Sequence, residues 1–413
     1  MNTSHASLAL ACLLSSALPV GAADTLTLQR ALERVHAGNP AIAAAAADAE
    51  STRARAARES MAPPLVLGAD IENFAGSGAM SGFDSAENTL QVSRLIELGG
   101  KRAGRRALGD AEVASAAHAL DSSRLDAVAL TTRRFVEVVA DQARLRLAVE
   151  RAHIAARTRA EVERVVTSAR NPETDLRAAE IALGDAELER AHWEHELRAA
   201  RMTLASTWGS RDPDFGEAAM SLETLPALAS FETLATRLPR SASMMGWQLE
   251  AAGAQARLQL ARAQSRPDLN VGLGVRRLEA FDDHGLVMSL SMPLGSPSRA
   301  RLAHAESRAA ATAIAHRREA AEIDAYQQLF EIYQELGHAR AEFTAIGESM
   351  IPRADHALEL ARRGFDLGRF SFLALTQAQE TLFELRRRRI DAAARFHTLL
   401  ADLQRLTAAV ESP

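Results

Sequence analysis

Two histidines stand close enough together to suggest metal chemistry. His192 and His195 flank Trp193 and Glu194 in a segment with the composition of a helix. Residues three apart lie on one side of a helix, so both imidazoles could reach one Zn²⁺-like ion. No third ligand stands at a matching spacing, and the pattern favours a solvated helix face. We therefore predict no resident metal and keep His192 and His195 as weak candidates only.

Motifs that carry catalysis are absent from the sequence. It contains no G-x-S-x-G nucleophile elbow, no phosphate-binding glycine loop, no H-E-x-x-H and no C-x-x-C. The single cysteine, Cys12, lies in the apolar N-terminal segment, so removal of that segment would leave no thiol. We predict that the protein is not an enzyme and needs no cofactor.

Charge and composition exclude further classes. The chain carries 48 Lys and Arg against 53 Asp and Glu, for a formal net charge of −5, so no basic excess indicates nucleic acid. The basic run Arg386 to Arg389 is interpreted as a helix face that pairs with neighbouring glutamates. Aromatic residues make up only 4%, and abundant alanine would let helices approach closely.

The N-terminus predicts export. Residues 1–23 contain an apolar core from Leu8 to Val20, followed by small residues suited to signal cleavage near Ala22 or Ala23. Lipidation of Cys12 is disfavoured because it would leave a very short signal. No later stretch approaches ~18 consecutive strongly apolar residues, so entry into a membrane would require a closed β-barrel.

Two segments alternate apolar and polar residues with the period of a strand. Pro63, Leu65 and Gly68 align with Pro267, Leu269 and Gly272, and each segment is followed by a polar loop and a second alternating stretch. We predict β-hairpins at about 64–97 and 268–293. They divide the chain into repeats at 24–208 and 230–413, joined by a Gly- and Pro-rich linker at 209–229.

The rest of each repeat reads as helix. We predict helices over Leu26 to Met61, Lys101 to about Thr167 and Asp175 to Ser206, and the same arrangement around the second hairpin. Breaks fall at about 168–175 and 364–373. The helix from Lys101 would be roughly 100 Å long, which no single core could bury. Four strands also cannot close a barrel, whereas a trimer would supply about twelve.

This ordered plan resembles the TolC family of outer-membrane efflux channels. "LERVHAGNPAI" resembles the family's opening helix, and "GRFSFLALTQAQETLFELRRRRIDAAARFHTLLADLQRL" its closing helix. "RLIELGGKR" resembles the strand-to-helix corner of the branch related to CzcC, the outer component of heavy-metal exporters. The resemblance covers nearly all of the chain after the signal and rests on the order and repetition of these motifs.

The resemblance implies a mainly α fold with a membrane β part. Three chains would form a 12-stranded barrel in the outer membrane of a Gram-negative bacterium, standing on an α-helical barrel in the periplasm. The implied function is a passive exit duct, with a periplasmic adaptor and an inner-membrane RND-type pump as partners and divalent metal cations as cargo. Drugs, organic solutes or secreted proteins are alternative cargoes. A periplasmic coiled-coil scaffold or adaptor is the alternative from another class.

The resemblance also assigns roles to residues at the two helix breaks. Adaptor docking would use Asn171, Pro172, Gly368, Phe370 and Phe372, although Phe370 and Phe372 could instead cap the chain's own core. The periplasmic gate would use Thr174 and Asp175, with Arg363, Asp366 and Arg369 as candidates on the other hairpin. The alternative for Asp175 is a helix N-cap. The family's second-half acidic positions fall on Ala374 and Gln377.

The alternation within the hairpins predicts a lipid-facing surface. In the strand that contains Leu269 to Val275, one face carries large aliphatic residues and the other carries Asn270, Gly272 and Gly274, which would face the lumen. The predicted lipid-facing residues are Leu65, Leu67, Ile71, Leu90, Val92, Ile96, Leu269, Val271, Leu273, Val275, Met288, Leu290 and Met292.

Overall fold

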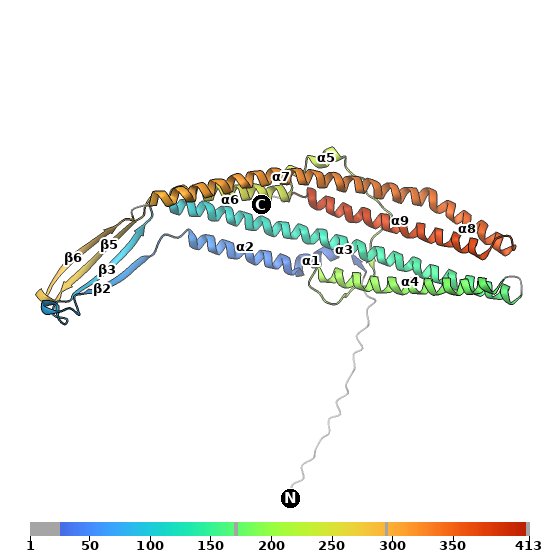
Figure 1. The fold of residues 1–413 in the computed structure, drawn as a ribbon, viewed down its shortest axis with the longest axis horizontal. Coiled ribbons are helices and arrows are strands. Elements are labelled where there is room, and N and C mark those ends of the chain that lie inside the picture. The colour runs from blue at the N-terminus through green and yellow to red at the C-terminus, as the bar shows by residue number, and fades with distance from the viewer. Residues whose placement is uncertain (1–24, 169–171, 294–295, 410–413) are drawn as a thin grey trace, which may run out of the picture.

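A four-stranded antiparallel sheet forms one end of the chain, and long helices run from it to the opposite end (Figure 1). The computed structural model describes residues 25–168, 172–293 and 296–409. The predicted signal at 1–23, with Cys12, and the predicted docking residue Asn171 lie outside these residues. Each half of the chain contributes helix, two strands and then long helices, in that order.

The sheet joins the two predicted hairpins into one surface. Its order is β2-β3-β5-β6, so the second strand of the first hairpin pairs with the first strand of the second. Leu90 is opposite Val275 in that central pair. Within the described residues, β2 and β6 each have one unpaired edge. The strands are β2 (Leu65–Glu72), β3 (Glu87–Ile96), β5 (Leu269–Leu278) and β6 (Asp283–Ser291).

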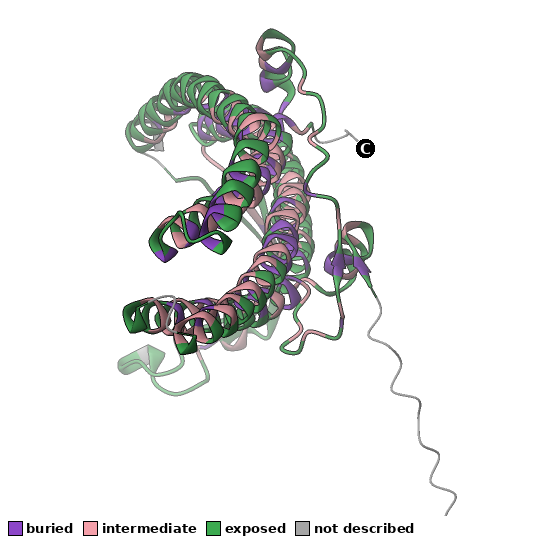
Figure 2. Cartoon of the chain, turned by 90° about the vertical axis from the view of Figure 1, so that its right-hand side faces the viewer, coloured by how far each residue is buried: buried purple, intermediate pink, exposed green. Residues whose placement is uncertain are grey.

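The helices form a curved wall. Helix α3 is 67 residues long and contacts α2, α4, α6 and α9. Seen along the long axis, the helices follow a C-shaped arc, with buried residues in strips between neighbours (Figure 2). In the described part of the chain, no helix has the length and hydropathy of a membrane-spanning segment. The helices are α1 (Leu28–Gly38), α2 (Pro40–Glu59), α3 (Lys101–Thr167), α4 (Glu173–Ser206), α5 (Phe231–Ala235), α6 (Ala242–Ala263), α7 (Ser296–Ala345), α8 (Ile351–Asp366) and α9 (Phe372–Thr407).

Two predicted helices are interrupted. The helix predicted over Leu26 to Met61 is divided at Asn39, whose side chain accepts hydrogen bonds from the backbone N–H groups of Ala41 and Ile42 and so starts α2. The long helix after Pro297 contains one π-helical turn, Ile346–Met350. Pro352 follows that turn, and a proline removes a backbone donor from the regular helical ladder.

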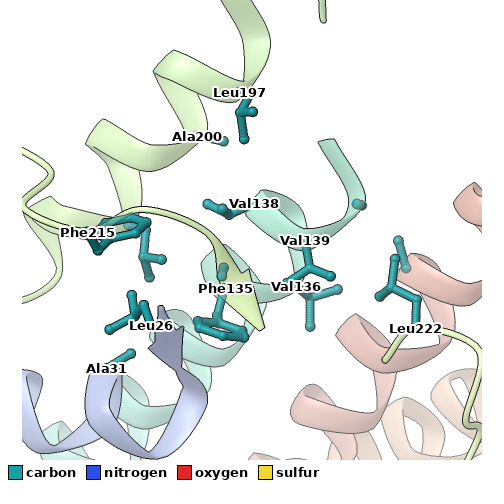
Figure 3. Packing of buried hydrophobic residues seen from close by; sticks show 14 of the residues in the cluster. Leu26, Ala31, Phe135, Val136, Val138, Val139, Leu197, Ala200, Phe215 and Leu222 are labelled. Atoms are coloured by element: carbon teal, nitrogen blue, oxygen red, sulfur yellow. The ribbon is translucent and has the colours of Figure 1, made fainter. Parts of the chain in front are cut away.

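The linker is anchored to the wall by a small strand pair that the sequence pattern does not predict. Strand β1 (Leu26–Thr27) pairs in parallel with β4 (Ala218–Ala219) from the linker. The buried Gln142 on α3 donates to the carbonyl of Ala218 and accepts from its N–H. Beside this pair lies the main core, where Leu26, Phe135 and Phe215 are brought together from β1, α3 and the linker (Figure 3).

Candidate functional site

The predicted lipid-facing residues share one face of the sheet. The strand register places Leu67 opposite Val92, Val92 opposite Leu273, and Leu273 opposite Met288. Because side chains alternate along each strand, the whole predicted set falls on this face, with Met292 just beyond β6. Leu269 and Val271 are partly buried and the others are exposed. Leu286, 92% exposed, belongs to the same face and was missed.

An apolar face of this size requires a partner. Leu67 is 70% and Met288 69% exposed, and a contiguous patch of such residues normally marks contact with protein or lipid. We name this surface the apolar sheet face, defined by the predicted lipid-facing residues, Ala69 and Leu286.

Most side chains on the opposite face of the sheet are small or polar, and the larger apolar ones there are Val66, Leu95, Leu278 and Val287. Gly272 and Gly274 lie on it, beside the side chain of Gln91. Near the hairpin ends, Arg276 bridges Glu72 at 3.0 Å and Glu87 at 2.6 Å, and it donates to Thr89. Glu72 and Glu87 are opposite each other in the register, so Arg276 offsets a repulsion between like charges. The alternation in the sequence predicts small and polar residues on this face, but it does not predict the Arg276 network.

At the far end of the molecule, Gly368 ends α8. Its φ of 70° is left-handed, a conformation that glycine adopts without steric cost. The Gly368 N–H donates to the carbonyl of Phe365, and the carbonyl of Gly364 accepts from the N–H groups of Arg369 and Phe370. These bonds satisfy the carbonyls at the helix end and direct the chain back into α9.

The prediction that Phe372 is an exposed docking residue is wrong. Its side chain is 3% exposed and packs with Phe365, at 6.1 Å between ring centroids. Both belong to the core at the end of the molecule where α8 turns into α9, which we call the tip. Phe370 is half exposed and lies against Gly364. The exposed apolar residues there include Leu367 and Leu373, at 67% and 64%. Leu367 and Leu373 lie on either side of the Gly-Arg-Phe-Ser turn, so their position near the turn in the sequence could have indicated that they are exposed.

The first-half break lies at the same end. Pro172 precedes α4 and is exposed, and Glu173 at the start of α4 pairs with Arg177 at 2.7 Å. Pro172, and not Asp175, occupies the N-cap position, so the N-cap alternative for Asp175 is wrong. Asp175 is the third residue of α4 and is partly buried, whereas Thr174 is exposed. The two breaks share one core, containing Val162, Ala179, Ala361, Phe365, Phe372 and Leu375.

The other gate candidates are also at this end. Arg363 is exposed and forms an ion pair with Glu359 at 3.1 Å, on its own helix. Asp366 and Arg369 are exposed on either side of Gly368. The fold thus brings the candidates from both halves to the end opposite the sheet (Figure 1).

Replacing Gly368 with valine is expected to distort the tip without affecting the sheet. A β-branched residue at a φ of 70° is strained by about 1–3 kcal/mol, so the turn between α8 and α9 should change shape. On the role that the resemblance implies, cargo export from cells should fall while the amount of protein in the outer membrane stays normal. The control is Gly184→Val, because a Cβ at Gly184 meets nothing within 4 Å. Normal export by Gly368→Val would argue against docking at this tip.

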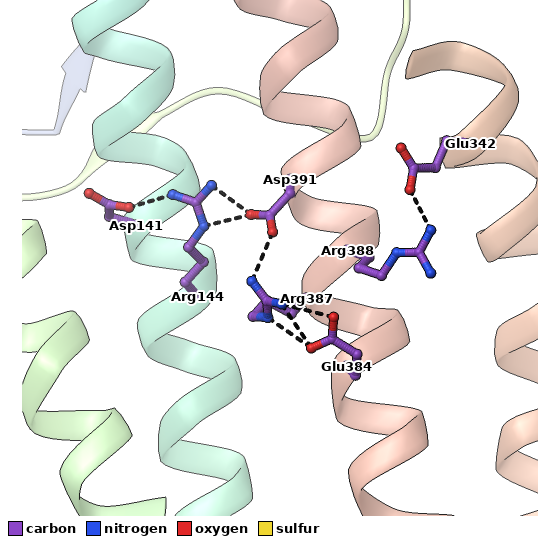
Figure 4. Close-up of polar contacts among 7 residues, drawn as sticks. All are labelled: Asp141, Arg144, Glu342, Glu384, Arg387, Arg388 and Asp391. Atoms are coloured by element: carbon purple, nitrogen blue, oxygen red, sulfur yellow. Dashed lines mark hydrogen bonds and ion pairs between the residues drawn. The ribbon is translucent and has the colours of Figure 1, made fainter. Parts of the chain in front are cut away.

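The basic run on α9 pairs with acidic side chains, as predicted. Arg387 binds Glu384 and Asp391, and Arg388 binds Glu342 at 2.7 Å (Figure 4). Arg386 pairs with Glu150 and Asp355, and Arg389 lies 3.6 Å from Glu223. From α3, Arg144 reaches Asp391 and Asp141, each at 2.6 Å. These pairs connect α9 with α3, α7, α8 and the linker.

The histidine pair gains no further ligand. His192 is exposed, with its Nδ1 4.0 Å from Glu196. In residues 25–168, 172–293 and 296–409, no group of three or more His, Cys, Asp or Glu side chains could hold a metal ion.

Comparisons with known proteins agree with this geometry. A family model described as "Outer membrane efflux protein" matches residues 237–409. The cobalt-zinc-cadmium resistance protein CzcC of Cupriavidus metallidurans is 28% identical over 394 residues, covering 94% of this chain and 91% of the relative.

Two solved structures share the fold. A membrane protein from Pseudomonas aeruginosa superposes with a TM-score of 0.81 at 16% identity, covering 92% of each chain. CusC, whose structures concern folding and transmembrane channel formation, superposes with a TM-score of 0.78 at 15% identity, covering 93% of this chain and 92% of CusC. The second half of the chain thus matches the outer membrane efflux protein model, nearly the whole chain is similar to CzcC, and the chain shares the fold of these two solved structures.

Proposed function

We propose that the protein is the passive outer-membrane exit duct of a tripartite efflux system. The observation that carries this proposal is the two-faced sheet, with an exposed apolar face on one side and small and polar residues on the other. Such a sheet suits a wall between lipid and an aqueous lumen. The periplasmic scaffold alternative offers no role for the apolar sheet face.

The assembly is a homotrimer. Strands β2 and β6 leave edges that another copy can pair with, and three copies of the four-stranded sheet supply 3 × 4 = 12 strands. The C-shaped arc of helices in one chain would become one third of a periplasmic tunnel (Figure 2). Closure would remove the open edges at β2 and β6, which no other strand of the described residues covers.

The proposed cargo is a heavy-metal cation, either a divalent one of the Co, Zn and Cd class or one of the Cu and Ag class. Support comes from the similarity to CzcC, named for cobalt, zinc and cadmium resistance. A duct need not bind its cargo tightly, so the chain requires no resident metal. Drug efflux or protein secretion through the same channel would be favoured if its loss sensitised cells to organic compounds and not to these metals.

The end opposite the sheet would hold both the gate and the docking surface. In a trimer, three Asp175 carboxylates would surround the axis, attract cations and narrow the passage. Thr174, Arg363, Asp366 and Arg369 would complete this ring of charged and polar side chains. The periplasmic adaptor would contact the exposed residues Pro172, Leu367, Phe370 and Leu373, in a turn whose shape depends on Gly368. An inner-membrane RND-type pump would supply the energy for export.

Planar-bilayer conductance tests both the channel and the gate. The purified protein should give cation-selective steps, and Asp175→Ala should enlarge them or reduce the selectivity because a charged constriction is removed. The control is Glu173→Ala, which removes an exposed acidic residue two positions earlier, already paired with Arg177. Equal steps for wild type and Asp175→Ala would place the gate elsewhere. If folded trimers of both the wild type and Asp175→Ala gave no conductance, the proposal that the protein forms a channel would be contradicted.

A further inference from the structure

One arginine interrupts the apolar sheet face. Arg94 lies in β3, opposite Leu65 on one side and Val271 on the other. Its side chain is exposed and forms no hydrogen bond or ion pair within the described residues. Leu65 and Leu290 in the same row are 66% and 63% exposed, so Arg94 lies in a row of otherwise aliphatic side chains.

Polar residues reappear on this face only near the hairpin ends. There Asn88, Arg277 and His284 form one row across β3, β5 and β6. Arg277 is paired with Glu279 at 3.2 Å and Asp282 at 3.1 Å, unlike Arg94. Six residues along β3 separate the two rows, which is about 20 Å of strand, or about 15 Å across a membrane for a tilted strand.

Arg94 lies one row inside the end of the apolar sheet face that is nearest α3, because Ile96 and Leu269 continue the face beyond it. Arg94 is two residues from Ile96, the last residue of β3, on the side where the chain continues into α3. A charged side chain on a lipid-facing strand is costly at the membrane midplane, and the cost nearly disappears at the interface. A long arginine side chain can also extend its charged end toward the interface while its methylene groups stay in contact with apolar surface.

We propose that Arg94 binds the headgroup phosphate of a phospholipid in the periplasmic leaflet of the outer membrane. The inference rests on the proposed function, which places the apolar sheet face in lipid. A guanidinium matches a phosphate with two parallel charge-assisted hydrogen bonds. Strand β3 is central in the sheet order, so neighbouring copies at β2 and β6 leave Arg94 open to lipid. Each trimer would hold one such lipid per chain at its inner boundary.

Native mass spectrometry of the full-length trimer in detergent, titrated with dioleoylphosphatidylglycerol, tests the proposal. Wild type should retain phospholipid in preference to the phosphate-free dioleoylglycerol. Arg94→Gln should weaken phospholipid retention about tenfold, and Arg94→Lys should be intermediate because it keeps the charge without the planar fork. The control is Arg308→Gln, which removes an exposed arginine from α7.

Vesicle flotation separates this inference from the proposed function. Arg94→Gln and Arg94→Leu should still insert, since each removes a charge from an apolar surface. Equal lipid retention by wild type and Arg94→Gln, in protein that inserts, would overturn the inference alone. Displacement of the lipid by millimolar inorganic phosphate would do the same, because it would show a general anion site. Wild-type protein that never enters vesicles would remove both proposals.

Discussion

Leu273→Arg is expected to reduce the assembled trimer in the outer membrane sharply. Leu273 is 62% exposed at the middle of the apolar sheet face, between Val92 and Met288 in the register. Arginine on a lipid-facing strand costs about 2–4 kcal/mol at the bilayer midplane. All three chains would carry the charge, so the penalty is paid at three places in one assembly. Heat-resistant trimer on a semi-native gel, compared with total protein, measures the effect.

The matched control for that variant lies on the other face at the same depth. Ser93 is opposite Gly272, the residue next to Leu273, and its side chain projects to the polar face. Ser93→Arg introduces the same charge beside a glycine, where the proposed lumen provides water and room. It should assemble nearly as well as wild type. Normal assembly of Leu273→Arg, or equal loss in both variants, would show that the apolar sheet face does not contact lipid.

Arg144→Met is expected to destabilise the helical wall by about 3 kcal/mol. Arg144 joins Asp141 to Asp391 between α3 and α9 (Figure 4). Its guanidinium lies 5.1 Å from the ring centroid of Trp193. Asp141 is only 4% exposed. Removing one member of a buried ion pair leaves the other charge without compensation, which is more costly than removing both. Chemical unfolding of the purified trimer, followed by circular dichroism, measures the change.

The loss of stability caused by Arg144→Met should become smaller as the pH falls. Burial already raises the pKa of Asp141 above its ordinary value of 3.8, against the opposing hydrogen bond from Arg144. Loss of Arg144 removes that hydrogen bond and raises the pKa further. A raised carboxyl pKa means that stability is lost as pH rises through it and recovered as pH falls. The difference from wild type should therefore be smaller at pH 5 than at pH 7.

Two companion variants isolate the buried charge. Arg146→Met removes an arginine two residues away, whose pair with Glu217 is more than 60% exposed on both sides, and should cost less than about 1 kcal/mol. Asp141→Asn combined with Arg144→Met removes the uncompensated carboxylate and should regain much of the lost stability at pH 7. If the double variant were as unstable as Arg144→Met alone, the loss would come from packing on Trp193 and not from charge.

Local pattern determined the strands and most helix ends. Alternation of Leu269, Val271, Leu273 and Val275 with small and polar residues predicts both the strand and its apolar face, because side chains of an extended chain point alternately to opposite sides. Gly368 predicted the end of α8 because few other residues adopt a left-handed φ. The same alternation places Arg94 on the apolar face, so its position there can also be predicted from the sequence.

The tertiary structure decided the contacts between residues that lie far apart in the sequence, which a local pattern cannot predict. Whether Phe372 docks a partner or fills the tip depends on Phe365 and Val162, which arrive from other helices and bury it. The pairing of β1 with β4 depends on the hydrogen bonds between Gln142 and Ala218, which are 76 residues apart in the sequence. A local residue pattern cannot predict a contact over that distance. Strand pairing between the two hairpins likewise joins Leu90 to Val275 across the rest of the first repeat, the linker and the start of the second repeat. The sequence by itself thus determined the elements, their faces and the family they resemble, and the packing between distant segments decided which side chains remain exposed to act.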